Sequence, residues 1–81
     1  MNLEYDSDSD VLYLTFDDAE CQRAYVENER GDILIIDKSN DRVVGCTIPF
    51  ALYRLKRDGS ILIPEIGSIP LNDKFRELVG Q

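Results

Sequence analysis

The sequence predicts a small α+β protein, an antiparallel β-meander of four to five strands with a short C-terminal helix. Short runs of β-branched and aromatic residues alternate with polar turns over residues 2–55. The end of the chain instead places apolar residues at helical spacing. With 81 residues, the chain has the size of one domain. We therefore predict a single domain, 1–81, with the meander in 2–55 and an edge strand plus the helix in 56–81.

The first clear strand covers residues 11–16, where apolar and β-branched residues alternate between two faces: Leu12, Leu14 and Phe16 on one, and Val11, Tyr13 and Thr15 on the other. Residues 22–29 alternate polar with apolar positions, which indicates a half-exposed strand. Arg30-Gly31-Asp32 then predicts a turn, because glycine tolerates positive φ.

The run Ile33–Ile36 is wholly apolar and short, which favours a strand buried on both faces. A polar turn over 38–41 separates it from the next strand, Val43–Phe50. Within that strand Gly45 permits a bulge or a close approach of backbone. Pro49 cannot donate to a ladder, so we expect the strand to end there or to lie at an edge.

Residues 51–57 predict a short helical turn that ends at Asp58-Gly59. Ile61–Ile63, closed by Pro64, predicts a short edge strand. The C-terminal helix is expected to begin at Asn72 as its N-cap and to present one apolar stripe before stopping at a glycine: Phe75, Leu78, Val79 and then Gly80.

The chain is acidic, with a net charge of −7 that is unevenly distributed. Residues 1–41 hold twelve acids and three bases, whereas residues 42–81 hold four acids and six bases. An acidic surface repels phosphates, which argues against nucleic-acid binding and favours solubility or a basic protein partner. The chain also lacks a secretion signal and a long apolar run, so we expect a cytoplasmic protein that does not enter a membrane.

No histidine is present, which removes the commonest general base and transition-metal ligand. Cys21 and Cys46 fit neither a zinc motif nor a redox pair, so we expect two reduced thiols. The serines have no base at a known motif spacing, and no glycine-rich phosphate loop occurs. We predict a protein that is not an enzyme, with no catalytic residue and no cofactor.

The stretch Asp6-Ser7-Asp8-Ser9-Asp10 allows two interpretations. Its three aspartates, Asp6, Asp8 and Asp10, have the spacing of positions 1, 3 and 5 of a calcium loop. The loop pattern then fails, because Val11 replaces the glycine of position 6 and Asp17 replaces the glutamate of position 12. A turn in which aspartates accept backbone N–H groups is the favoured interpretation. A divalent-cation-responsive module is the alternative.

Two surface features bear on partners. The only basic cluster is 53–57 (YRLKR), which we interpret as a solvated face, with contact to an anionic partner as the alternative. The central strands are apolar on both faces, and one small helix covers little of a sheet, so residues 51–70 or another chain must cover part of that surface. We favour another chain and expect a homo-oligomer, with a homodimer as its simplest form.

The chain resembles domain-of-unknown-function family 2283 over about Asn2 to Leu55. Its opening is similar to the family pattern YDxxxDxLYIxL at these positions: Tyr5, Asp6, Asp10, Leu12, Tyr13, Leu14 and Phe16. The stretch from Ile33 through Arg42-Val43-Val44-Gly45 to Ile48 is similar to the second half, V-x-L-D-x-D-G-R-V-V-G-I-E-I. It departs from that half at Lys38, Asn40, Asp41 and Thr47.

This resemblance implies a small β-meander with a short helix, common in bacteria and archaea, with no established activity and no catalytic residues. Some members are thought to be encoded beside small toxins, which suggests an antitoxin role. We therefore expect a small non-enzymatic protein-interaction domain, antitoxin-like, that captures a basic, toxin-like protein by complementary charge. The resemblance also favours a structural role for Asp6 and Asp10, in a hairpin connection between Tyr5 and Tyr13.

Overall fold

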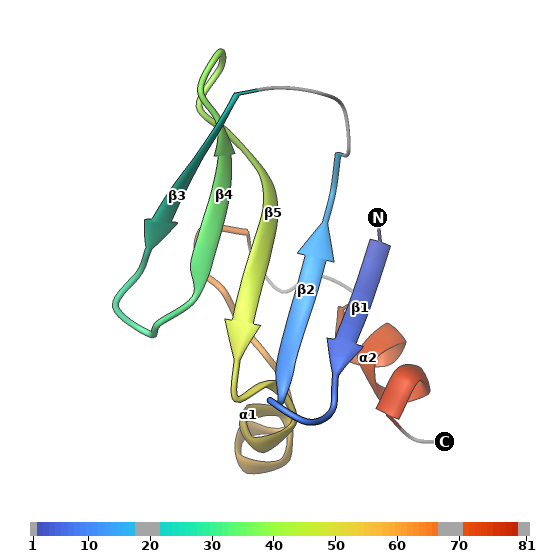
Figure 1. The fold of residues 1–81 in the computed structure, drawn as a ribbon. Helices are drawn as coiled ribbons and strands as arrows, with labels where there is room; N and C mark the ends of the chain where they lie inside the picture. Colours follow the sequence, from blue (N-terminus) through green and yellow to red (C-terminus); the bar gives the residue numbers. More distant parts are fainter. Residues whose placement is uncertain (1, 18–21, 67–70, 80–81) are drawn as a thin grey trace.

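The computed structural model describes residues 2–17, 22–66 and 71–79, which form one five-stranded antiparallel sheet and two helices (Figure 1). The elements in chain order are β1 (Asn2–Asp6), β2 (Val11–Thr15), β3 (Arg23–Glu27), β4 (Ile33–Asp37), β5 (Arg42–Pro49), α1 (Ala51–Asp58) and α2 (Leu71–Val79). The predicted α+β class, an antiparallel sheet of up to five strands with a C-terminal helix, is confirmed.

The order of the strands across the sheet is β1-β2-β5-β4-β3. Strands β3, β4 and β5 follow one another as a meander, and the β1–β2 hairpin is added at the far side of β5. The neighbour of β2 is therefore β5 rather than β3. This pairing places Leu14 opposite Cys46 and Leu12 opposite Ile48, so that four buried side chains come together.

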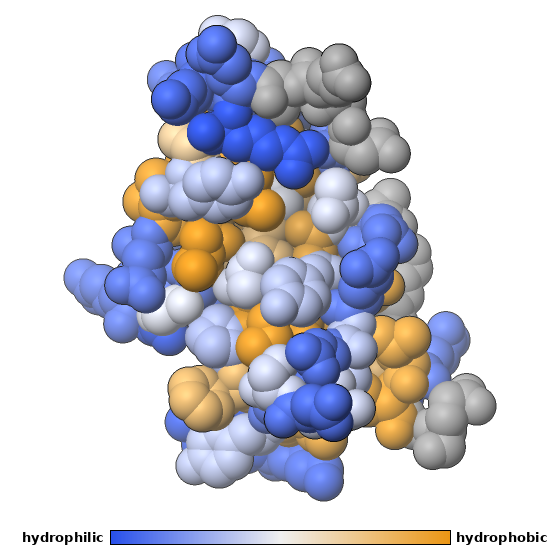
Figure 2. Space-filling view, viewed as in Figure 1, coloured by the Kyte–Doolittle hydropathy of each residue, from blue (hydrophilic) through white to orange (hydrophobic). Residues whose placement is uncertain are grey.

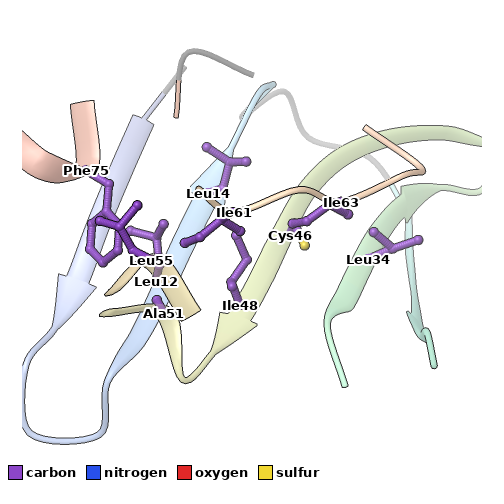
Figure 3. Packing of buried hydrophobic residues seen from close by; sticks show 10 residues of the cluster. All are labelled: Leu12, Leu14, Leu34, Cys46, Ile48, Ala51, Leu55, Ile61, Ile63 and Phe75. Atoms are coloured by element: carbon purple, nitrogen blue, oxygen red, sulfur yellow. The ribbon is translucent and has the colours of Figure 1, made fainter. Parts of the chain in front are cut away.

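One face of the sheet carries the hydrophobic core (Figure 3). Alternate residues of β2, β4 and β5 point to this face, where α1, α2 and the segment 61–63 cover them. The cluster consists of Leu12, Leu14, Leu34, Cys46, Ile48, Ala51, Leu55, Ile61, Ile63 and Phe75. Burial of these side chains is the main favourable contribution to the fold.

Gly45 in β5 allows the neighbouring strands β2 and β4 to approach β5 closely. A Cβ atom at this position would lie 2.7 Å from the backbone oxygen of Leu14 and 3.3 Å from Cδ1 of Ile35. The register of β4 against β5 also shifts between Ile35 and Ile36, which pair with Gly45 and Val43. The predicted close approach and irregularity at this glycine are therefore both present, and β5 ends at Pro49 as expected.

The segment 61–63 corrects one expectation, because it has an isolated bridge at Ile63 in place of an edge strand. Its side chains still alternate: Ile61 and Ile63 are buried, whereas Leu62 is exposed. The segment lies across the face of the sheet (Figure 3), so its apolar residues are used for packing against the strands. An apolar run of this length does not reveal whether it will extend a sheet or cover one.

The two helices lie close to their expected positions. α1 ends at Asp58, and Gly59 after it has a φ of 77° and donates its N–H to the backbone oxygen of Leu55. α2 begins at Leu71, so that Asn72 lies inside the helix rather than before it. The expected stop at Gly80 lies outside the described residues. Within the expected apolar stripe Phe75 is fully buried, but Leu78 is 44% exposed.

Candidate functional site

The acidic stretch 6–10 forms the turn between β1 and β2. The Asp6 carboxylate accepts a hydrogen bond from the backbone N–H of Asp8 at 3.0 Å, which is an Asx turn. Asp10 closes the turn with a φ of 55°, a left-handed conformation that aspartate tolerates better than most residues. The favoured interpretation of this stretch as a turn agrees with the geometry.

Asp10 also caps α1, which lies far from it in the chain. The residue at the N-cap position of that helix, Phe50, offers no side-chain hydrogen bond. The backbone oxygen of Asp10 accepts the N–H of Ala51 at 3.0 Å, and its carboxylate accepts the N–H groups of Leu52 and Tyr53 at 2.7 and 3.3 Å. One residue therefore satisfies the N–H groups that a helix start leaves without partners.

The Tyr5 hydroxyl completes this arrangement by donating to the Asp10 carboxylate at 2.8 Å. Burial of the phenol, together with Asp10, raises the pKa of Tyr5 to about 12. The turn is therefore held to both the sheet and the helix. Asp8 is exposed, and within the described residues no group of three or more acidic or thiol side chains is arranged to hold a metal ion.

We expect Asp10→Ala to destabilise the fold by about 1–2 kcal/mol, because α1 loses its cap and the turn loses a residue suited to positive φ. Asp10→Asn retains an acceptor oxygen and should lose less. Asp8→Ala, in the same turn but with an exposed side chain, should stay within about 0.5 kcal/mol. Urea unfolding followed by circular dichroism measures all three, and an equal loss for Asp8→Ala and Asp10→Ala would contradict the capping role.

A buried ionic network joins the β3–β4 turn to α1. Asp32 is fully buried, and its carboxylate lies 2.5 Å from Nη1 of Arg54 and 3.4 Å from Nε of Arg30. Asn28 donates its amide to the same carboxylate at 3.1 Å and accepts the Asp32 backbone N–H at 2.9 Å. Arg30 in turn contacts both oxygens of Glu65 at 2.9 Å. The network therefore also holds the segment after Ile63.

The basic cluster 53–57 does not form a free anion-binding patch. Arg54 is the partner of the buried Asp32, and Arg57 pairs with Asp58 at 2.8 Å while lying 5.5 Å from the centre of the Tyr53 ring. The expectation of a solvated face is therefore wrong for Arg54. A cleft of about 860 Å³ lies beside these residues, and exposed apolar side chains line part of it: Phe50, Tyr53 and Leu62.

Cys46 has the character of a core residue. It is fully buried, and burial raises the pKa of its thiol to about 12. A thiol with this pKa is a poor nucleophile at neutral pH. Cys46 is a free thiol, which agrees with the expected reduced state. Cys21 lies outside the described residues, so its relation to Cys46 stays a prediction.

Neither helix of the described residues lies over the second face of the sheet, and we call this surface the open face. In Figure 1 the segment that follows α1, drawn in orange, passes behind the strands, and α1 lies at their lower end, so the viewer looks onto the open face. One row of paired residues crosses all five strands on this face: Glu4, Tyr13, Thr47, Ile33 and Glu27. Acids stand at both ends of the row, with Tyr13 and Ile33 between them.

A neighbouring row on the open face contains Thr15, Gly45, Ile35 and Tyr25. Tyr13 is 44% exposed and Tyr25 is 66% exposed. Figure 2, drawn from the same side, shows apolar groups gathered in the middle of this face and hydrophilic groups around its margins. An exposed apolar patch with a polar rim is typical of a protein–protein contact surface. The open face is therefore the candidate functional site.

Sequence reasoning found part of this surface. The alternation in residues 11–15 placed Tyr13 opposite the core positions correctly, and the excess of apolar surface was expected. It did not identify Asp32 and Arg54 as partners, because they are separated by a turn, two strands and the start of α1. No local sequence pattern indicates that Asp32, in a turn, pairs with Arg54, on a helix.

Comparisons with known proteins identify one family. Residues 2–51, more than half of the chain, match the family described as "Protein of unknown function (DUF2283)". No curated protein and no solved structure matches the chain. Among the described residues, neither helix has the length and apolar character needed to span a bilayer. The matched region holds the whole sheet and the Asp10 cap, and the chain belongs to the DUF2283 family of proteins of unknown function.

Proposed function

We propose that this chain is a non-enzymatic, cytoplasmic interaction domain that binds a basic protein through the open face, in the manner of an antitoxin. The observation that carries this proposal is the row from Glu4 through Tyr13, Thr47 and Ile33 to Glu27. It combines an apolar centre, which gains free energy on burial, with an acidic rim, which attracts cations.

The charge of the whole chain supports a basic partner. The net charge is −7, so association with a basic protein is accelerated by long-range attraction and slowed by salt. The row also places Glu4 and Glu27 on opposite margins of the face. A partner with lysines or arginines around an apolar contact would match both margins at once.

The chemistry of the chain supports a binding role over catalysis. The sequence holds no histidine, and the described thiol, Cys46, is buried with a raised pKa. The carboxylates of Asp6 and Asp10 already accept N–H groups of the chain itself. We also propose that the chain acts as a homo-oligomer, because a sheet of this size leaves the open face and its edges uncovered.

Affinity capture from the source cells tests this proposal with a matched pair of variants. Tyr13→Glu places a charge in the centre of the open face, whereas Leu78→Glu changes a residue of equal exposure, 44%, on α2. We expect the wild type and Leu78→Glu to enrich the same basic protein, and Tyr13→Glu to lose it. Calorimetry with that purified protein should show weaker binding at high salt.

Two results would contradict the proposal. A wild-type chain that stays monomeric and enriches no protein over a blank resin has no interaction function under these conditions. Equal capture of the partner by Tyr13→Glu and Leu78→Glu would place the contact away from the open face.

A further inference from the structure

β3 is an edge strand that lacks two features that often block strand pairing, a proline and a bulge. β4 is its hydrogen-bonded neighbour, and β3 ends the strand order of the described sheet. Natural edge strands are often protected by proline, by a bulge or by a covering element. The sequence of β3, RAYVE, has no proline or glycine, and its register with β4 is unbroken. Tyr25 and Val26 are 66% and 46% exposed.

Two hydrogen bonds determine which backbone groups of β3 face outward. The N–H of Lys38 donates to the oxygen of Gln22, and the N–H of Asn28 donates to the oxygen of Asp32, both at 2.9 Å. Bonded and non-bonded pairs alternate along an antiparallel ladder. The even-numbered residues of this stretch therefore bond to β4. The N–H and C=O groups at the free edge belong to the odd-numbered residues: Arg23, Tyr25 and Glu27.

We propose that two copies of this chain pair through their β3 edges, antiparallel, with a two-fold axis at Tyr25. In this register the outward backbone groups of Tyr25 bond to those of Tyr25 in the second copy. Those of Arg23 bond to those of Glu27 in the second copy, and the reverse pair follows by symmetry. Every outward N–H of the strand then meets a C=O.

The side chains of β3 favour the same register. Arg23 and Glu27 stand at opposite ends of the strand, so a two-fold axis between them places unlike charges opposite each other. Parallel pairing in the same alignment would place like charges together. Val26, which is 46% exposed, falls opposite Ala24 of the second copy on the core side.

The pairing also has a consequence for binding. Two five-stranded sheets become one continuous sheet, and their two open faces become one surface. Tyr25 then lies at the centre of that surface. The inference deepens the proposed function and rests on it, because it names the contact through which the interaction domain associates with itself.

Tyr25→Pro is the sharpest test, because the N–H of Tyr25 faces the free edge. Proline there removes an outward donor and obstructs a second strand, while the ladder to β4 keeps its bonds. Sedimentation equilibrium should show a dimer for the wild type and a dimer at least about thirtyfold weaker for the variant, since two hydrogen bonds are lost. Tyr13→Thr, an exposed tyrosine on a central strand, is the control and should remain dimeric.

A charge exchange gives a second test that does not depend on the proline variant folding. Glu27 lies opposite Ile33 in its own chain, so Glu27→Arg meets no charge there, whereas Arg23 lies opposite Asp37. Glu27→Arg alone places an arginine opposite Arg23 of the other copy, twice by symmetry, and we expect the dimer to weaken by about tenfold or more. The double variant Arg23→Glu, Glu27→Arg should recover most of that loss.

The outcomes separate this inference from the proposed function. A wild-type dimer that survives both Tyr25→Pro and Glu27→Arg would show that the copies meet elsewhere, which overturns the β3 contact and leaves the interaction domain in place. If the wild type is monomeric and captures its partner only when Tyr25 is intact, a strand of that partner pairs with β3, and the proposed self-pairing is wrong. A monomer without any partner would overturn both.

Discussion

Arg54→Met is expected to destabilise the protein by about 3 kcal/mol, because it leaves the buried carboxylate of Asp32 without its closest cation. Asp32 is fully buried, and Arg54 approaches it to 2.5 Å from α1. Methionine fills a similar volume, so the loss arises mainly from charge. Arg30, at 3.4 Å, and Asn28 remain as partners and keep the effect from being larger. Urea unfolding followed by circular dichroism provides the measurement.

Arg57→Met is the matched control, since Arg57 lies on the same helix and also pairs with a carboxylate. Its partner Asp58 is about half exposed, as Arg57 is, and an exposed ion pair contributes about 0.5 kcal/mol. The double variant Asp32→Asn, Arg54→Met removes the buried charge along with its partner, and we expect it to be more stable than Arg54→Met alone. Equal losses for Arg54→Met and Arg57→Met would mean that Asp32 does not depend on α1.

The sequence allowed four of the five strands to be located, because each of those four has a local signal, whereas β1 was not predicted as a strand. The alternation around Leu12 and Leu14, the apolar run Ile33–Ile36 and the turns at Gly31 and 38–41 lie where the structure has β2, β4 and their connections. The β-propensity of these short runs and the turn residues between them are sufficient to locate such strands. The strand order was less accessible, because the pairing of β2 with β5 joins residues far apart in the chain.

The same limit applies to the polar contacts. Asp10 was expected in a turn, and its local role was correct, but its function as the cap of α1 involves residues more than forty positions away. The helix and turn propensities of single residues do not reveal that the cap of α1 comes from the β1–β2 turn. The absence of a capping side chain at Phe50 is visible only once the helix start is known. It then indicates that an acceptor must come from elsewhere.

These contacts explain why the open face stays uncovered. Asp10 holds the start of α1 at the β1–β2 turn, and Arg54 holds its body to the β3–β4 turn. The contact between Glu65 and Arg30 then holds the segment that follows α1. A hydrogen bond from the backbone N–H of Glu65, together with Arg30, keeps the pKa of the Glu65 carboxyl below its usual value. Both covering elements are therefore fixed to the core side of the sheet, and the described chain leaves Tyr13 exposed and Ile33 partly exposed on the open face.

Phe75→Ala should destabilise the protein by about 3–4 kcal/mol, although α2 lies beyond the region that matches the family. Phe75 is fully buried, and its ring meets that of Tyr5 edge to face at a centre-to-centre distance of 5.1 Å. It covers the β1 side of the core, close to Leu12 and Leu55 in Figure 3. Truncation leaves a cavity that the ends of short strands fill poorly.

Leu78→Ala, in the same helix, separates burial from helical propensity. Leu78 is 44% exposed, so its truncation should cost less than about 1 kcal/mol. Thermal unfolding of the two variants and the wild type gives the comparison, and Phe75→Leu should fall between them because it restores part of the volume. If Phe75→Ala lost no more stability than Leu78→Ala, α2 would not be part of the core, and the sheet would need another element, from the same or a second chain, to cover β1.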